Sequence, residues 1–200
     1  MHRFFQRSLP LVMLACAGSP LVAEAAPHVR TGFCAGVGFG FESVSWSDED
    51  DRQPSENSGV MNARAGWAVK PDMVLGVEFW GWAKDVEVLA GDFVVPVEVQ
   101  LGAVTACATL FPDAGGFFVR LGAGLAYGQV TVEPPPTVTE VVAGKKTRTG
   151  FAANIAPGYE WRVSKRLAIG LQGDIVYLGL GDPLHNAFGY GVNAQFNWYW

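Results

Sequence analysis

The sequence predicts an all-β fold, an eight-stranded antiparallel transmembrane barrel with short turns at one end and long loops at the other. Residues 188–200 place an apolar or aromatic side chain at every even position and a small or polar residue at every odd one, which is the period of a strand. Similar alternation recurs seven more times, and the connections are long and short in turn. Beyond the N-terminal segment, no apolar run reaches the roughly 20 residues of a spanning helix. A membrane-crossing form of this chain would therefore be a barrel.

Composition and the N-terminus agree with one exported domain. The 200 residues include 25 glycines and 12 prolines, which disfavour long helices because glycine costs roughly 1 kcal/mol and proline about 3 kcal/mol inside one. Residues 1–25 have a basic start, an apolar stretch and an Ala23-Glu24-Ala25 cleavage site, which together indicate a cleavable signal peptide. Residues 26–200 form the barrel domain. Its acidic balance disfavours nucleic acid as a partner.

The three cysteines indicate neither a disulfide nor a metal site. Cys16 follows Leu14-Ala15, which also resembles a bacterial lipoprotein cleavage box. Cys34 and Cys107 are predicted to face opposite ways from strands that lie several strands apart. A disulfide needs Cβ atoms about 4 Å apart, so we expect two isolated thiols. No metal-type spacing and no cofactor motif is present, and we predict neither group.

The first strand is predicted at 31–46, with Phe33, Phe39 and Phe41 facing outward and a glycine-rich face inward. The polar segment 47–58 follows and is predicted to be a solvated surface loop. Its acidic run 48–51 carries carboxylates that suit divalent cations, but it lacks the spacing of a calcium loop.

The next two strands, 60–69 and 73–82, are joined by a tight turn at Lys70-Pro71-Asp72. Symmetric pairing about Pro71 sets Arg64 opposite Glu78 on the inward face. Opposite charges at facing positions are one way that a barrel tolerates charge inside.

A loop at 83–96 and a fourth strand at 97–111 follow. Alternation is weakest in this fourth strand, where we predict Val104, Ala106 and Leu110 to face inward. A fifth strand begins at Phe117, and a long, partly extended connection at 131–147 contains three consecutive prolines.

The sixth strand, 149–162, contains Pro157, which cannot donate to the ladder and predicts a bulge or local break. A turn at 163–165 leads to the seventh strand, which begins at Leu167. Pairing about Ser164 would set Asp174 opposite Asn154. A last loop at 178–187 precedes the final strand at 188–200.

Outward aromatic residues fall at two levels, which is typical of the two interfaces of a membrane. The predicted belt near the short turns consists of Trp67, Phe111, Phe117, Tyr159, Trp161, Trp198 and Trp200. The belt near the long loops consists of Phe41, Phe79, Tyr127, Tyr177, Phe188 and Tyr190. A soluble secreted barrel, which is the alternative, would gather its aromatics inside.

Polar residues on the inward faces are the candidate site. They are Arg64, Glu78, Glu98, Gln100, Arg120, Asn154, Glu160, Gln172, Asp174, Asn193 and Gln195. An eight-stranded barrel has an interior just wide enough for side chains to fill, so these residues predict a hydrogen-bonded polar plug. A narrow polar or gated pore is the alternative.

The signal peptide, the alternation of connections, the Gly-x-Gly-x-Gly first strand and the Tyr199-Trp200 ending resemble the small outer-membrane barrels of the OmpA/OmpX type, in the wider opacity-related superfamily. The resemblance covers residues 31–200. It implies a monomer in the outer membrane of a Gram-negative bacterium, in contact with membrane lipid and lipopolysaccharide. It also implies that Phe196, Trp198 and Trp200 form the signal for the barrel assembly machinery, and that the exterior loops meet an extracellular ligand that the sequence does not identify.

Two other functions stay open. A small channel or carrier for hydrophobic compounds, as in the OmpW-like relatives, is favoured by Val74, Trp80, Val104 and Leu110 if these face inward. A lipid A-modifying enzyme would need a serine and a histidine, and only His185 is placed to join Ser43 or Ser45. No His-x-Ser pattern supports that pairing, and we predict no enzyme and no catalytic residue.

Overall fold

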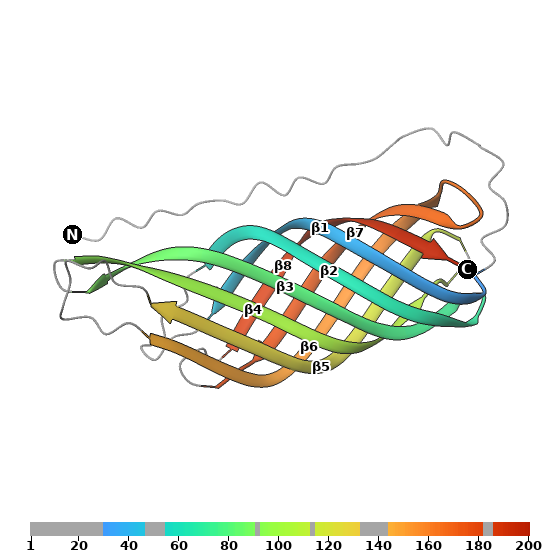
Figure 1. Ribbon diagram of the computed structural model, residues 1–200. Coiled ribbons are helices and arrows are strands. Elements are labelled where there is room, and N and C mark those ends of the chain that lie inside the picture. Colours follow the sequence, from blue (N-terminus) through green and yellow to red (C-terminus); the bar gives the residue numbers. More distant parts are fainter. Residues whose placement is uncertain (1–29, 47–54, 91–92, 113–114, 133–143, 182–185) are drawn as a thin grey trace, which may run out of the picture.

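The computed structural model is a closed barrel in which each of eight antiparallel strands pairs with its neighbours in chain order (Figure 1). The structure describes residues 30–46, 55–90, 93–112, 115–132, 144–181 and 186–200. The strands are β1 (Gly32–Trp46), β2 (Ser55–Lys70), β3 (Met73–Ala90), β4 (Phe93–Leu110), β5 (Phe117–Val132), β6 (Gly144–Arg162), β7 (Leu167–Gly179) and β8 (Asn186–Tyr199). Because β1 pairs with both β2 and β8, the barrel has no open seam. The predicted fold class is confirmed.

Several predicted features lie outside the described residues. These are the signal peptide, Cys16, the acidic run 48–51, the three prolines of 134–136 and His185. Among the residues that the structure does describe, none forms a helix long and apolar enough to span a membrane.

Alternation along each strand separates an apolar exterior from a mixed interior. In β8 the exposed side chains are the predicted even-numbered ones, and the odd-numbered Asn193, Gln195 and Asn197 are buried. Phe41 in β1 is 79% exposed and Leu125 in β5 is 72% exposed. This exterior is contiguous and apolar around the barrel, which is the reverse of a soluble β-protein.

The aromatic side chains of the two predicted belts face the exterior, with one exception. Trp67, Tyr159 and Trp198 are exposed near the short turns, and Tyr177 and Tyr190 are exposed toward the other end. The predicted member Phe111 does not belong to its belt. It is 2% exposed and packs inward against Phe118, with ring centroids 5.8 Å apart. Phe111 continues the odd-numbered residues of β4, such as Thr105 and Thr109, which are buried. Its misplacement therefore follows from the wrong facing predicted for β4.

Four strands extend beyond their predicted bounds by four residues or more. β2 begins at Ser55, β3 continues to Ala90, β4 begins at Phe93 and β6 begins at Gly144. Parts of the predicted loops 47–58, 83–96 and 131–147 are therefore strand. The reason is visible in β3, where Asp85 and Glu87 are exposed and alternate with the partly buried Val86. Their charge reflects a solvated strand face and not a loop.

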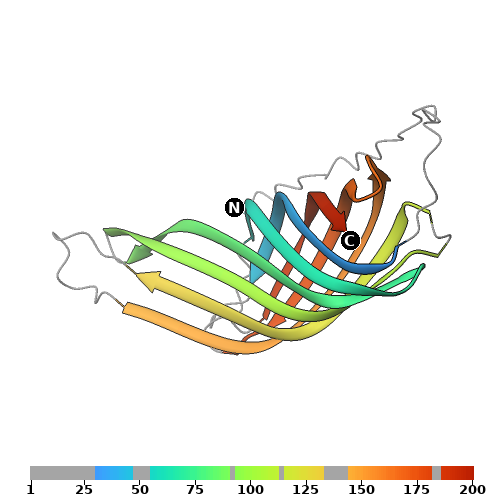
Figure 2. The ribbon, with the colours of Figure 1, turned by 45° about the vertical axis from the view of Figure 1, so that its right-hand side comes forward.

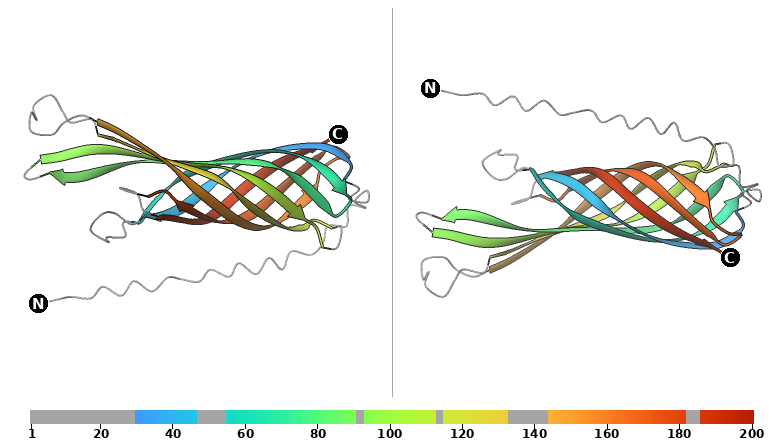
Figure 3. Two further views of the ribbon diagram at one scale, coloured as in Figure 1. Left: turned by 90° about the horizontal axis from the view of Figure 1, so that it is seen from below. Right: turned by 90° about the horizontal axis from the view of Figure 1, so that it is seen from above.

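The extra length forms a sheet that extends beyond one end of the closed barrel (Figures 1 and 2). We name it the protruding sheet, and it consists of residues 83–90, 93–100, 128–132 and 144–150. Pairing of β3 with β2 ends at Trp82↔Val60, whereas its pairing with β4 continues to Ala90↔Phe93. Likewise β6 pairs with β5 up to Gly144 but with β7 only up to Phe151. The views from below and above show the same extension (Figure 3).

The facing of β4 is opposite to the prediction. Val104 and Leu110 are exposed, at 51% and 38%, whereas Thr105 and Thr109 are buried. Ala106 is also exposed, and it pairs with Val77, which faces outward in β3. Small and apolar residues occupy both faces of β4, so composition did not distinguish the inside from the outside.

Two of the hairpins at the short-turn end differ in how well symmetry predicted their register. The β2–β3 hairpin turns at residues 71–72, and Arg64 pairs with Glu78 as predicted. The β6–β7 turn contains four residues, 163–166, with the Val163 amide donating to the Leu167 carbonyl at 2.9 Å. The pair Arg162↔Ala168 centres the hairpin register on Lys165, one residue later than Ser164.

The later turn centre shifts the register of β6 against β7 by two residues. Asn154 pairs with Val176 and not with Asp174, so that predicted pairing is wrong. The predicted disturbance at Pro157 is confirmed as a local break. Partners on β7 are lost between Ile155↔Ile175 and Gly158↔Gln172, and the register is the same on both sides.

Candidate functional site

The barrel interior is divided into three layers along its axis. Near the short turns lies a small apolar cluster of Val74, Phe111 and Phe118. Hydrogen-bonded polar and charged side chains occupy the middle. Toward the protruding sheet lies a larger apolar cluster that includes Trp80, Trp82, Leu101, Leu178 and Leu180. The polar layer is the candidate site, because buried polar groups are retained where they are mutually satisfied.

Glu78 on β3 is the centre of the polar layer. Its Oε1 accepts a hydrogen bond from Nη1 of Arg120 on β5 at 2.9 Å. Its Oε2 accepts from Nδ2 of Asn154 on β6 at 3.0 Å. Nη1 of Arg64 on β2 lies 3.8 Å from the same carboxylate. Removing two charges from water is favourable only when they are paired and bonded in this way.

Arg120 extends the network across the barrel. Its Nε donates to Oγ1 of Thr109 at 3.1 Å, and its Nη1 donates to Oε1 of Gln172 at 2.7 Å. Nε2 of Gln172 in turn donates to both carboxylate oxygens of Asp174, at 2.8 and 2.7 Å. The planar guanidinium thus joins β5 to β3, β4 and β7, which suits its fixed fork of donors.

Glu42 and Asp174 form the side of the polar layer nearest the larger apolar cluster. Nδ2 of Asn193 donates to Glu42 at 3.2 Å and also to Asp174. Nε1 of Trp80 donates to the Glu42 carboxylate at 3.1 Å. The indole ring of Trp80 belongs to the apolar cluster, so this tryptophan joins the two layers.

Glu160 on β6 binds residues from both ends of the described chain at the short-turn side of the barrel. It accepts hydrogen bonds from the Tyr199 hydroxyl at 2.7 Å and from Nδ2 of Asn197 at 3.0 Å. Arg30, which precedes β1, bonds the same carboxylate at 2.7 Å and the Gly115 carbonyl at 2.7 Å. The guanidinium carbon of Arg30 lies 3.3 Å from the centre of the Phe111 ring. These contacts close the barrel interior at this end.

Seven of the eight residues predicted for the interior network lie inside and are connected. They are Arg64, Glu78, Arg120, Asn154, Glu160, Gln172 and Asp174. Asn197 connects the side chains around Glu160 with those around Glu78, because it donates to Glu160 and accepts from Arg64. Asn193 and Gln195 also lie inside.

Glu98 does not belong to this network, and its predicted facing is wrong. It lies in the protruding sheet, and its Oε1 accepts from Nε2 of Gln100 at 2.7 Å. Even-numbered residues of β4 face outward, so the error in the facing of β4 placed both Glu98 and Gln100 on the wrong side.

Sequence reasoning missed several members of the network. Glu42 and Tyr199 occupy positions that alternation in β1 and β8 assigns to the inward face, so the sequence could have identified them. Arg30 gave no signal, because it precedes the first periodic segment and is buried only by the closure of the barrel. Thr109 was missed with the facing of β4.

Both described cysteines face inward. Cys34 and Cys107 line one cavity near the short turns, and both are free thiols. The prediction that they are unpaired is confirmed. The prediction of opposite facing is wrong, because odd-numbered residues of β4 point into the barrel.

The proposed assembly-signal residues lie on the exterior of β8 at the short-turn end. Phe196 and Trp198 are exposed, and Trp200 follows them with its amide donating to the Phe33 carbonyl at 2.9 Å. The Trp200 and Phe33 rings are 5.3 Å apart. The C-terminus is thereby held to β1, and an assembly role for these residues stays a prediction.

Comparison with known proteins gives likeness in structure but not in sequence. No protein-family model and no curated protein matches the chain. The crystal structure of Ail, the attachment invasion locus protein of Yersinia pestis, solved with the heparin analogue sucrose octasulfate, is similar with a TM-score of 0.60 and 11% identity, covering 83% of this chain and 99% of that one.

Two further solved structures are similar over their whole length. Neisserial surface protein A has a TM-score of 0.58 and 14% identity, covering 86% of this chain and 99% of its own. The outer membrane protein OprG from Pseudomonas aeruginosa has a TM-score of 0.57 and 9% identity, covering 88% of this chain and 100% of its own. At these identities the likeness concerns the fold. The chain has the fold of the small eight-stranded outer-membrane β-barrels.

Proposed function

We propose that the mature chain is a monomeric integral protein of the outer membrane of a Gram-negative bacterium. The apolar exterior of the closed barrel and its aromatic residues at two levels support this location. Outer-membrane lipid and lipopolysaccharide then cover the exterior, and the β8 ending serves the barrel assembly machinery. The short turns face the periplasm and the protruding sheet faces outward from the cell.

Epitope insertion tests this orientation. A tag at the β3–β4 connection, residues 91–92, is expected to bind antibody on intact cells. A tag in the β6–β7 turn, residues 163–166, is expected to bind only after the outer membrane is permeabilised. Equal access to both tags on intact cells would contradict the orientation.

Within that location we propose a surface-interaction role carried by the protruding sheet. Its two outer strand segments, 83–90 of β3 and 144–150 of β6, each have only one paired neighbour among the described residues. Such edges present unpaired backbone donors and acceptors to any extended segment of a partner. The β6 edge also exposes Lys145 and Lys146, which favours an anionic partner.

Binding of immobilised heparin by cells that express the protein tests this role. The probe is chosen because the Ail structure contains a heparin analogue, and because Lys145 and Lys146 are exposed here. Lys145→Glu with Lys146→Glu is expected to abolish binding, since it reverses the charge of the edge. Lys165→Glu in the β6–β7 turn is the matched control and is expected to bind normally. Equal loss in both variants, or binding that neither variant changes, would contradict the role.

The interior is then a structural plug. The polar network fills the middle layer, and apolar clusters lie on both sides of it. A plug predicts that the purified protein gives no conductance steps in planar bilayers.

A carrier for hydrophobic compounds is the second candidate, and one observation favours it. Trp82 is buried in the larger apolar cluster, and its Nε1 has no hydrogen-bond acceptor among the described residues. An apolar ligand with an acceptor oxygen would satisfy that donor. Saturable quenching of tryptophan fluorescence by a brominated fatty acid, lost in Trp82→Phe, would support a carrier. Quenching that the variant leaves unchanged would exclude this site.

A further inference from the structure

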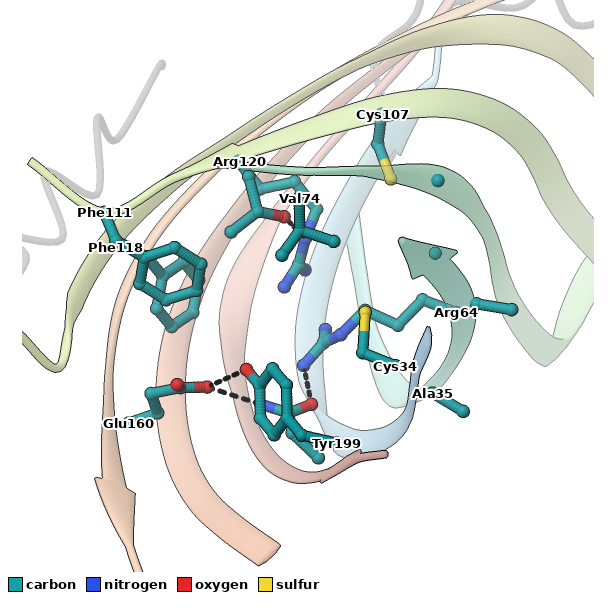
Figure 4. A pocket seen from close by; sticks show the side chains of 15 residues that line it. Cys34, Ala35, Arg64, Val74, Cys107, Phe111, Phe118, Arg120, Glu160 and Tyr199 are labelled. Atoms are coloured by element: carbon teal, nitrogen blue, oxygen red, sulfur yellow. Dashed lines mark hydrogen bonds between the residues drawn. The ribbon is translucent and has the colours of Figure 1, made fainter. Parts of the chain in front are cut away.

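The short-turn half of the interior contains a cavity of about 30 Å³, between the polar network and the small apolar cluster (Figure 4). Its polar lining includes Cys34, Arg64, Cys107, Thr109 and Arg120. A cavity needs roughly 10–15 Å³ to hold one water molecule. This one therefore has room for a monatomic ion or for one or two waters.

Two glycines line the cavity between the thiols. Cys34, Gly66, Gly76 and Cys107 are successive partners across β1, β2, β3 and β4. No side chain stands between the two thiols along this row. A Cβ atom on Gly66 would lie 2.6 Å from the Leu75 carbonyl oxygen, so the position does not accept a larger residue without movement.

Two guanidinium groups point into this space from different strands, Arg64 from β2 and Arg120 from β5 (Figure 4). They share one carboxylate, Glu78, at 3.8 and 2.9 Å. The other hydrogen-bond acceptors of Arg64 are the neutral amides of Gln195 and Asn197. Nη1 of Arg64 is buried without a hydrogen-bond acceptor among the described residues.

The other buried carboxylates do not contact this second guanidinium directly. Glu160 also lines the cavity, but it already binds Arg30 at 2.7 Å and lies 4.0 Å from Arg162. Asp174 is joined to Arg120 only through Gln172. Glu42, the fourth buried carboxylate, accepts from Trp80 and Asn193. Arg64 and Arg120 therefore have one carboxylate as their shared direct partner, and the buried Nη1 of Arg64 without an acceptor is unfavourable unless an anion or a water accompanies it.

We propose that this cavity is a site for one small monovalent anion of halide size, held between Arg64 and Arg120. The thiol groups of Cys34 and Cys107 and the hydroxyl of Thr109 supply weaker donors around it. The two guanidinium groups repel a cation. The small volume excludes a polyatomic anion such as sulfate. The site does not depend on the surface role of the protruding sheet.

Bromide in place of chloride locates the ion directly. Crystals of the mature barrel grown in sodium bromide are expected to give an anomalous peak between the guanidinium groups of Arg64 and Arg120. Ordered water at that position without an anomalous peak would overturn the proposal.

Thermal unfolding in detergent tests whether the ion matters to the protein. The unfolding midpoint is expected to be higher in sodium chloride or bromide than in sodium gluconate at equal concentration. Cys107→Leu fills the cavity and keeps both arginines, so the halide effect is expected to disappear. Cys107→Ser keeps the volume and a donor, and the effect is expected to persist. If the peak is present but Cys107→Leu leaves the halide effect unchanged, or no halide effect exists, the ion is an adventitious ion only and the proposal fails.

Discussion

Glu78 holds the polar layer together, because side chains from three other strands meet its two oxygens. Arg120 and Asn154 bond it, and Arg64 lies 3.8 Å away. Removing one partner of a buried charge pair leaves the other uncompensated, which typically destabilises by about 3–5 kcal/mol. The network is therefore far more sensitive to the loss of one member than a set of surface ion pairs would be.

The substitution Glu78→Gln is expected to lower the free energy of unfolding by about 3–5 kcal/mol, because Arg64 and Arg120 lose their shared carboxylate. The measurement is guanidinium-induced unfolding from lipid vesicles. Glu98→Gln removes the same charge from the outer face of β4 and is the matched control, with an expected change within about 0.5 kcal/mol. Equal effects of the two substitutions would contradict the assigned facing of β4.

Arg30 closes the short-turn end of the barrel interior. The thiols of Cys34 and Cys107 line the cavity inside this end. The Arg30 guanidinium stacks on Phe111 and binds Glu160 and Gly115. Arg30→Ala is expected to admit water and to speed the labelling of Cys34 and Cys107 by a small maleimide in the folded protein. Arg166→Ala, in the exposed β6–β7 turn, is expected to label as slowly as the unaltered chain. If Arg30→Ala labels no faster, another contact seals this end.

At the scale of single strands, β4 is the element for which sequence and structure disagree most. Its outward residue Val104 is 51% exposed near the middle of the strand. A lysine on a lipid-facing position near the midplane of an outer-membrane barrel costs roughly 2–4 kcal/mol. Val104→Lys is therefore expected to reduce the free energy of unfolding in lipid by about that amount.

Gln129→Lys provides the comparison, because Gln129 lies in the protruding sheet beyond the apolar exterior. Little change is expected there, and the measurement is the same unfolding titration. If Val104→Lys leaves the free energy of unfolding unchanged, Val104 does not face lipid. The inward facing of Val104 predicted from the sequence would then be correct.

The elements also show what sequence alone could predict. The period of two placed every strand and assigned the facing of seven of them, because in those strands bulky and small or polar residues alternate. In β4, valine and alanine occupy both faces, so the signal is lost. Strand ends were missed because a solvated strand such as 83–90 carries as many charged residues as a loop. The β6–β7 register was missed because the composition of a turn does not determine its length.

The candidate site was predictable in part for the same reason. Inward parity identified Arg64, Arg120 and Asp174. Arg30 could not be identified, because its burial depends on contacts with β6 and with the β4–β5 connection that are distant in sequence. Contacts of that kind follow from the closed barrel and not from any local pattern.

For the whole molecule, the account requires that the described strands close into one barrel with its apolar face toward lipid. Every strand has two paired neighbours, and β1 meets β8 over thirteen residue pairs, from Cys34↔Tyr199 to Trp46↔Ala187. Ladder pairing without an open seam predicts unusual resistance to detergent, because no edge is available from which unfolding can begin. The protruding sheet lies outside this closed part.

Gel migration of the detergent-extracted outer-membrane fraction, boiled against unboiled, tests this most directly. The closed barrel is expected to stay compact in dodecyl sulfate until heated, so the unboiled protein should migrate at a different position from the boiled one. A single position in both lanes, with the protein released from cells as a soluble periplasmic species, would mean that the exterior described above is not a lipid-facing surface.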